Sequence, residues 1–166
     1  MIAKSYLQKN LEILDKLFIE STSATKGLFY SKLAILELCG WIEESMDDIL
    51  RTCYHRNIKN KKDRKEIDDF IKKNYGFDYD RNFRRMLTEI IGRKGVIKLE
   101  KKVDPVKFQI LQATLAKLKS SRDSEAHTHI KGITKRLDAP SVTKSNYLLV
   151  CDGLIEFNEK LREIGF

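Results

Sequence analysis

The stretch LFYSKLAILELCGWIEESMDDILRTCYHR, residues 28–56, decides the fold. Apolar side chains recur along it every three or four residues. This spacing belongs to an α-helix with one apolar face, and it predicts a single long helix whose apolar stripe packs in the core. Acidic side chains, Glu37 and Glu43 among them, fall on the other face. The stripe consists of Phe29, Leu33, Leu36, Cys39, Ile42, Met46, Ile49 and Cys53.

Helical spacing continues on both sides of this stretch. Further helices are predicted near residues 2–20, 67–77, 80–91, 104–119 and 143–163, and the Asp104–Pro105 pair is a typical helix start. Residues 92–102 combine two glycines with VIKL, so strand, loop and helix all stay open there. Only two prolines interrupt the 166 residues. We predict an all-α protein with one domain over residues 1–166, an up-down helical bundle of about five to six helices.

Composition narrows the partners and the compartment. The net charge of +8 favours a polyanionic partner, with nucleic acid first and an anionic membrane surface second. The three cysteines are widely spaced and form no CxxC pair, which favours buried thiols in a reducing cytoplasm over a disulfide framework or a zinc site. No apolar run approaches the roughly 18 to 20 residues of a membrane span. A cytoplasmic protein without a bound metal is expected.

A polar, titratable stretch, SSRDSEAHTHI, spans residues 120–130, after the apolar pattern that starts at Asp104. If that helix continued, Asp123 and His127 would share a face, so the aspartate could orient the imidazole. Arg122 and His127 are separated by roughly 140° around a helix and would not converge within one unbroken helix. They meet only if the helix ends near Glu125 or if a second copy of the site faces the first. The alternative is a solvated helix end, where basic side chains favourably meet the helix dipole.

The hexapeptide RDSEAH, residues 122–127, is similar to the R-[N/D/H]-x-x-A-H motif of the HEPN superfamily. The resemblance is sharp over residues 115–129 and elsewhere depends on helical order and chain length; the nearest subgroup is the RiboL-PSP type. It implies a metal-independent endoribonuclease without a cofactor, a homodimer in which two motifs form one composite site. His127 would take the 2′-hydroxyl proton or protonate the leaving 5′-oxygen, Arg122 would hold the scissile phosphate, and Asp123 would position one of them. The product would carry a 2′,3′-cyclic phosphate.

The resemblance also suggests supporting residues and partners. An acid on the long helix is expected to reach toward the motif, and Glu37 is our prediction for it. Contacts to the RNA backbone are predicted for the basic side chains that follow the motif, although plain solvent exposure is the better interpretation of His129. A toxin or phage-defence role, with an antitoxin or regulatory protein as partner, would fit such an enzyme. The predicted RNA-binding residues are His129, Lys131, Lys135 and Arg136.

Two other functions remain open at this point. The first is a non-catalytic HEPN-like module that binds RNA, nucleotides or a partner protein, which the long amphipathic helices suit equally well. A strictly monomeric state would favour this module over the dimeric enzyme. The second is an interfacial membrane binder, ranked last because no predicted helix pairs a large aromatic face with a dense Lys/Arg face.

Overall fold

A computed structural model describes residues 5–126, 128–130 and 136–166. The described residues form six α-helices and one short π-helical turn, with no strand among them, which confirms the predicted all-α helical bundle. None of the described helices combines the length and the apolar character needed to cross a membrane.

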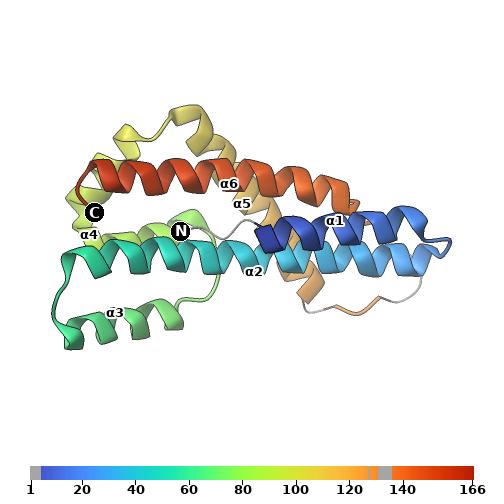
Figure 1. Cartoon of the computed structure of the whole chain (residues 1–166), viewed down its shortest axis with the longest axis horizontal. Helices are drawn as coiled ribbons and strands as arrows, with labels where there is room; N and C mark the ends of the chain where they lie inside the picture. Colours follow the sequence, from blue (N-terminus) through green and yellow to red (C-terminus); the bar gives the residue numbers. More distant parts are fainter. Residues whose placement is uncertain (1–4, 127, 131–135) are drawn as a thin grey trace.

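The two N-terminal helices form an antiparallel hairpin. α1 (Ser5–Glu20) ends in a short turn, and α2 (Ala24–Asn57) then runs the length of the molecule (Figure 1). The hydroxyl of Ser23 accepts a hydrogen bond from the backbone N–H of Lys26 and caps α2, so the helix begins directly after residues 21–23. Leu7, Leu11 and Leu14 of α1 are buried against α2 and the rest of the core.

The core closes around α6 (Pro140–Glu163), which lies alongside α1 and α2 in Figure 1 and also packs against α5 (Pro105–Ala126). Phe157 and Leu154 are fully buried there. Gly153 permits the close crossing of α5 and α6, since a Cβ at this position would lie only 2.9 Å from the Cβ of Leu111.

The segment between α2 and α5 is helical throughout most of its length. α3 (Lys61–Lys73) is attached to α2 by a 2.5 Å hydrogen bond from the Tyr54 hydroxyl to Asp68. A π-helical turn, η1 (Tyr79–Phe83), is capped by Asp78 and leads into α4 (Arg84–Lys102). Residues 92–102, left open between strand, loop and helix, are therefore helix. Gly92, with φ of 71°, kinks α4 without ending it.

Three residues of the predicted apolar stripe, Phe29, Leu33 and Leu36, are not in the buried core, so that part of the prediction was wrong. Phe29 is 53% exposed and Leu33 is 46% exposed, whereas Cys39 and Ile42 further along α2 are buried. At the N-terminal end of α2 the buried face is formed instead by smaller residues such as Ala34, which lies on a different side of the helix from Phe29 and Leu33. Because no other described helix covers Phe29 and Leu33, this end of α2 carries an apolar face toward solvent.

Candidate active site

Arg122 lies on the last turns of α5 and points toward α2. Its guanidinium Nη1 is 3.6 Å from Oε1 of Glu43, and its Cζ lies 5.5 Å from the centre of the buried Phe77 ring. The side chain is 27% exposed, so it is reachable from solvent while its position is held by the ring and the carboxylate. α5 continues past the point where the apolar pattern fades and ends at Ala126.

The arginine is bounded by two carboxylates but is not saturated by them. Nε of Arg122 is 3.0 Å from Oδ1 of Asp123, yet it makes no hydrogen bond within the described residues, although the atom is buried. The contact is therefore an ion pair in which the N–H is poorly aimed. The 3.6 Å contact to Glu43 is likewise longer than a hydrogen bond. The buried Nε is closed to solvent, so an added anion would meet only the exposed part of the guanidinium.

Burial controls the titration of the groups around Arg122. It raises the pKa of the Glu43 carboxyl above its usual range, while the positive charge of Arg122 acts in the opposite direction and Asp123 adds to the rise. Cys39, one turn before Glu43 on α2, is buried, and burial raises the pKa of its thiol to about 12. The thiol stays protonated at neutral pH, so it is not a nucleophile here.

The residues predicted for the site fall in three groups. Asp123 lies beside Arg122 and also pairs with Lys119 at 3.4 Å. His129 and Arg136 are exposed on the segment that follows α5. The positions of His127, Lys131 and Lys135 lie outside the described residues.

Glu37 is not the acid that reaches the motif, and Glu43 takes that place. Glu37 is exposed and accepts a 3.2 Å hydrogen bond from Asn10 of α1, on the side of α2 away from Arg122. The signal for Glu43 was available in the sequence: it stands four residues after Cys39, one helical turn along the edge of the buried stripe. Glu43 pairs with Arg122, whereas Glu37 makes no ion pair among the described residues.

The segment after α5 turns back toward the N-terminal half of α2. The Lys32 ammonium donates a hydrogen bond to the backbone oxygen of Thr128, and the Thr128 hydroxyl donates to the backbone oxygen of Ser124 at 2.6 Å. A polar hollow of about 290 Å³ opens beside this segment. The buried carboxyl of Glu125 and the side chains of Ser121 and Arg136 help to line it.

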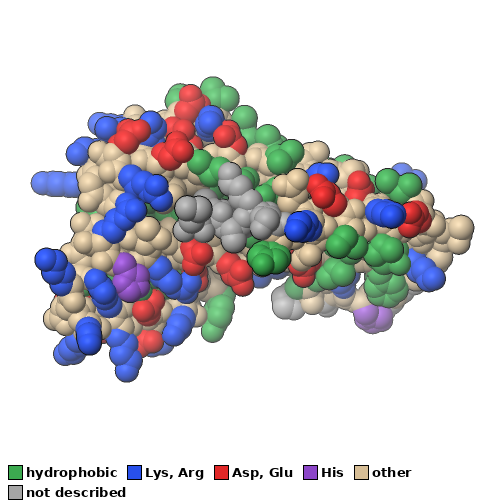
Figure 2. Space-filling model, in the orientation of Figure 1, with side chains coloured by type: hydrophobic (Ala, Val, Ile, Leu, Met, Phe, Trp, Pro, Cys, Tyr) green, Lys and Arg blue, Asp and Glu red, His purple; other side chains and the backbone are tan. Residues whose placement is uncertain are grey.

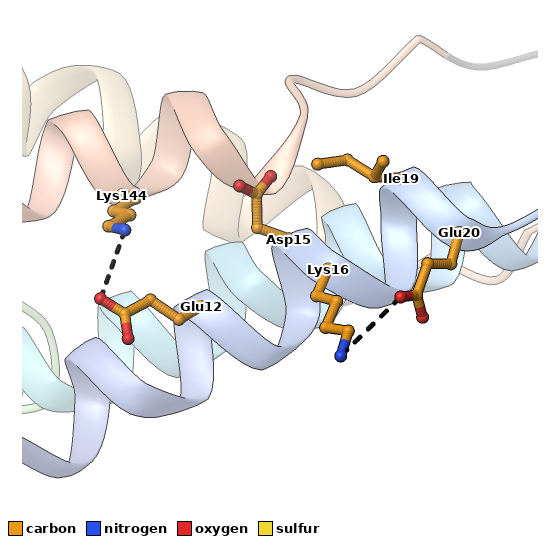
Figure 3. A pocket seen from close by; sticks show the side chains of 6 residues that line it. All are labelled: Glu12, Asp15, Lys16, Ile19, Glu20 and Lys144. Carbon is orange, nitrogen blue, oxygen red and sulfur yellow. Dashed lines mark ion pairs between the residues drawn. The ribbon is translucent and has the colours of Figure 1, made fainter.

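A hollow of about 300 Å³ elsewhere is explained by packing of α1 against α6. Figure 3 shows Glu12 of α1 turned toward Lys144 of α6 at 3.3 Å, and Lys16 paired with Glu20 at 3.8 Å. These side chains pair with each other and hold no converging donor set. Among the described residues, no group of three or more His, Cys, Asp and Glu side chains is placed to hold a metal ion.

Comparisons with known proteins give no match: no protein-family model, no curated protein and no solved structure is similar to the chain. The functional reasoning therefore depends on the residues and geometry of this chain.

Proposed function

We propose that the protein is a metal-independent endoribonuclease of HEPN type. In this reaction the 2′-oxygen of RNA attacks the adjacent phosphorus, the P–O5′ bond breaks, and a 2′,3′-cyclic phosphate and a free 5′-hydroxyl are formed. His127 removes the 2′-hydroxyl proton or supplies the proton to the 5′-oxygen. Arg122 binds the phosphate and stabilises the charge that grows on its oxygens.

One observation carries the proposal: the guanidinium of Arg122 is held in place but not saturated. Phe77 and Glu43 fix its position, its 3.6 Å contact with Glu43 is longer than a hydrogen bond, and about a quarter of the side chain reaches solvent. A structural arginine of this kind would normally have its donors satisfied by carboxylates or backbone oxygens. An arginine with unused donors next to the motif histidine in sequence is suited to a phosphate.

The proposed site is shared between two copies of the chain, as the resemblance to the HEPN superfamily implies. α5 ends at Ala126, next to Glu125, so the angle around the helix does not by itself decide between one chain and two. A homodimer in which the motif of each chain faces that of the other would bring an arginine and a histidine from different chains together. A cytoplasmic toxin or defence effector, regulated by a partner protein, is the biological setting that we propose for such an enzyme.

The test is cleavage of a labelled single-stranded RNA by the purified full chain, with and without EDTA. We expect EDTA to leave the rate unchanged, and mass spectrometry to show 2′,3′-cyclic phosphate ends. His127→Ala should lower the rate by about 10² to 10⁴, and Arg122→Lys, which keeps the charge but loses the fork of donors, by about 10².

His55→Ala is the matched control, because His55 is an exposed histidine at the far end of α2 that stacks on Tyr54. It should cleave RNA at the wild-type rate. If His127→Ala cleaves as fast as His55→Ala, or if EDTA abolishes cleavage, the enzyme proposal fails. Binding of RNA without cleavage by every variant would point to the non-catalytic module.

A further inference from the structure

The N-terminal half of α2 and the adjacent side of α1 expose a continuous apolar surface, here called the hairpin face. Figure 2 shows hydrophobic side chains gathered over the α1–α2 end of the molecule. On α2, Phe29 and Leu33 are exposed and lie along one side of the helix with Leu36 and Gly40. Three exposed α1 residues lie on the same side of that helix as Asn10, which bonds Glu37 of α2; they are Tyr6, Ile13 and Leu17.

The hairpin face has a hollow as well as projecting side chains. A hollow of about 270 Å³ lies between the start of α1 and the middle of α2, lined by Tyr6, Leu36, Gly40 and Trp41 among others. A Cβ placed on Gly40 would have nothing within 4 Å. The glycine therefore leaves open a space that no described side chain fills, about two helical turns beyond Leu33 and about three beyond Phe29.

Charges along the face complement one another end to end. The first part of α2 carries Lys26 and Lys32, and the later part carries Glu43, Glu44 and Asp47. Within the chain, Glu43 contacts Arg122 and Asp47 pairs with Arg51 at 3.0 Å, whereas Glu44 is exposed. Two copies of α2 packed parallel would place like charges together, whereas an antiparallel pair places the basic end of each against the acidic part of the other. Glu37, near the middle, is held by Asn10.

We propose that a second copy of this chain docks on the hairpin face, with the two α2 helices antiparallel about a two-fold axis close to Leu36. Leu33 of each chain then lies over the hollow at Gly40 of the partner subunit, and Lys26 lies opposite Asp47 of the partner subunit. The contact is isologous, because the same surface of each chain supplies both the projection and the hollow.

This arrangement explains how two chains build one site, and in that respect it rests on the proposed function. Within one chain, the backbone oxygen of Thr128 accepts a hydrogen bond from Lys32, which precedes Leu36 on α2. Arg122 contacts Glu43, which follows Leu36 on the same helix. A two-fold axis near Leu36 exchanges these two regions of α2. It brings the segment that contains Thr128 of the partner subunit beside the Glu43 region, where Arg122 of the first chain lies. Both regions face the α5 side of α2, so they meet on one side of the interface.

The position of the axis can be tested by cross-linking, because the native cysteines are all buried. Under mild oxidation, Leu36→Cys should form a disulfide-linked dimer, since the two positions lie next to the axis. Phe29→Cys is the matched control: it is about 11 Å from the axis along the helix, so its two copies are about 22 Å apart and should not link. If Leu36→Cys fails to link, or if Phe29→Cys links as readily, the arrangement is overturned.

Light scattering after size exclusion tests the interface itself and separates it from the enzyme proposal. Wild type should be a dimer, and Leu33→Asp should be a monomer with unchanged helical circular dichroism and no RNA cleavage. Leu148→Asp, which changes an exposed leucine on α6, should remain dimeric and active. A monomeric wild type or a dimeric Leu33→Asp overturns the interface. A wild-type dimer that does not cleave RNA leaves the interface standing and removes the enzyme.

Discussion

Replacing Glu43 by glutamine should strengthen the binding of RNA. The carboxylate of Glu43 lies 3.6 Å from Nη1 of Arg122 and competes with a phosphate for the same guanidinium. Glutamine keeps the shape and one acceptor oxygen, so Arg122 stays in place over Phe77 while one negative charge is removed. The change therefore alters the electrostatics of the site with little change in packing.

The size of the effect follows from the distance between the two anions. A phosphate bound on the open side of Arg122 would lie about 6 Å from Glu43, where two unit charges repel by roughly 0.7 kcal/mol in water and about 3 kcal/mol at an effective dielectric of about 20. Because about a third of each side chain is exposed, the lower part of this range applies. We expect about 1 kcal/mol, equivalent to about fivefold tighter binding.

Fluorescence anisotropy with a 2′-O-methyl RNA measures this affinity without cleavage, because the blocked 2′-oxygen is not a nucleophile. Asp48 lies on the exposed side of α2 and pairs with Arg51, not Arg122. Asp48→Asn removes the same charge and should tighten RNA binding much less. Equal affinities for Glu43→Gln and Asp48→Asn, or weaker binding by Glu43→Gln, would refute the competition between Glu43 and phosphate.

The raised pKa of Glu43 also predicts how the stability of Glu43→Gln relative to wild type depends on pH. Burial raises the pKa of Glu43, so the folded protein binds this proton more tightly than the unfolded chain does. The ionised carboxyl therefore opposes folding near neutral pH, and protonation relieves this as the pH falls. Glu43→Gln should melt at or above the wild-type temperature at about pH 7, and this advantage should shrink toward about pH 4. An advantage that grows in acid would contradict the raised pKa.

Three further predictions concern packing and reactivity. Gly153→Ala should destabilise the fold by about 1 to 2 kcal/mol in urea unfolding, because its Cβ would meet Leu111 at 2.9 Å and the overlap outweighs the gain in helix propensity; an unchanged midpoint would show that the crossing relaxes freely. Asp68→Ala removes the acceptor of the Tyr54 hydroxyl and should cost about 1 kcal/mol, with faster amide exchange confined to α3 if the bond holds that helix in place. The Cys39 thiol, with its pKa raised to about 12, should resist alkylation at about pH 8 until the protein is unfolded, and rapid labelling of the native protein would contradict its burial.

Helical periodicity predicted most of the fold but could not tell which apolar faces are covered. Phe29 and Leu33 continue the same three-and-four spacing as Cys39, so the sequence pattern treats them alike, yet they face solvent. Periodicity reports that a face is apolar, and the partner that covers it has to be read from the tertiary structure.

The two glycines left residues 92–102 open between strand, loop and helix, and the structure has a kink at Gly92 with helix on both sides of it. Val96 and Leu99 are buried at helical spacing after Gly92, which adopts a positive φ and bends the helix while the pattern resumes beyond it. In the candidate site, the sequence predicted the arginine that lies against α2 but chose Glu37 as its acid. The spacing places Glu43 one turn after Cys39, at the edge of the buried stripe, but only the tertiary structure shows that α5 crosses α2 at this edge.

The central place of α6 has a consequence for synthesis of the protein on the ribosome. α6 follows the other helices in sequence, yet its buried side chains complete the core that α1, α2 and α5 share. Until residues 140–163 leave the exit tunnel, α5 cannot pack against α6. The position of α5 on α2, and with it the position of Arg122, is then not fixed. If the proposed function holds, nascent chains without α6 should not cleave RNA near the translating ribosome, and cleavage should arise only after that helix has docked.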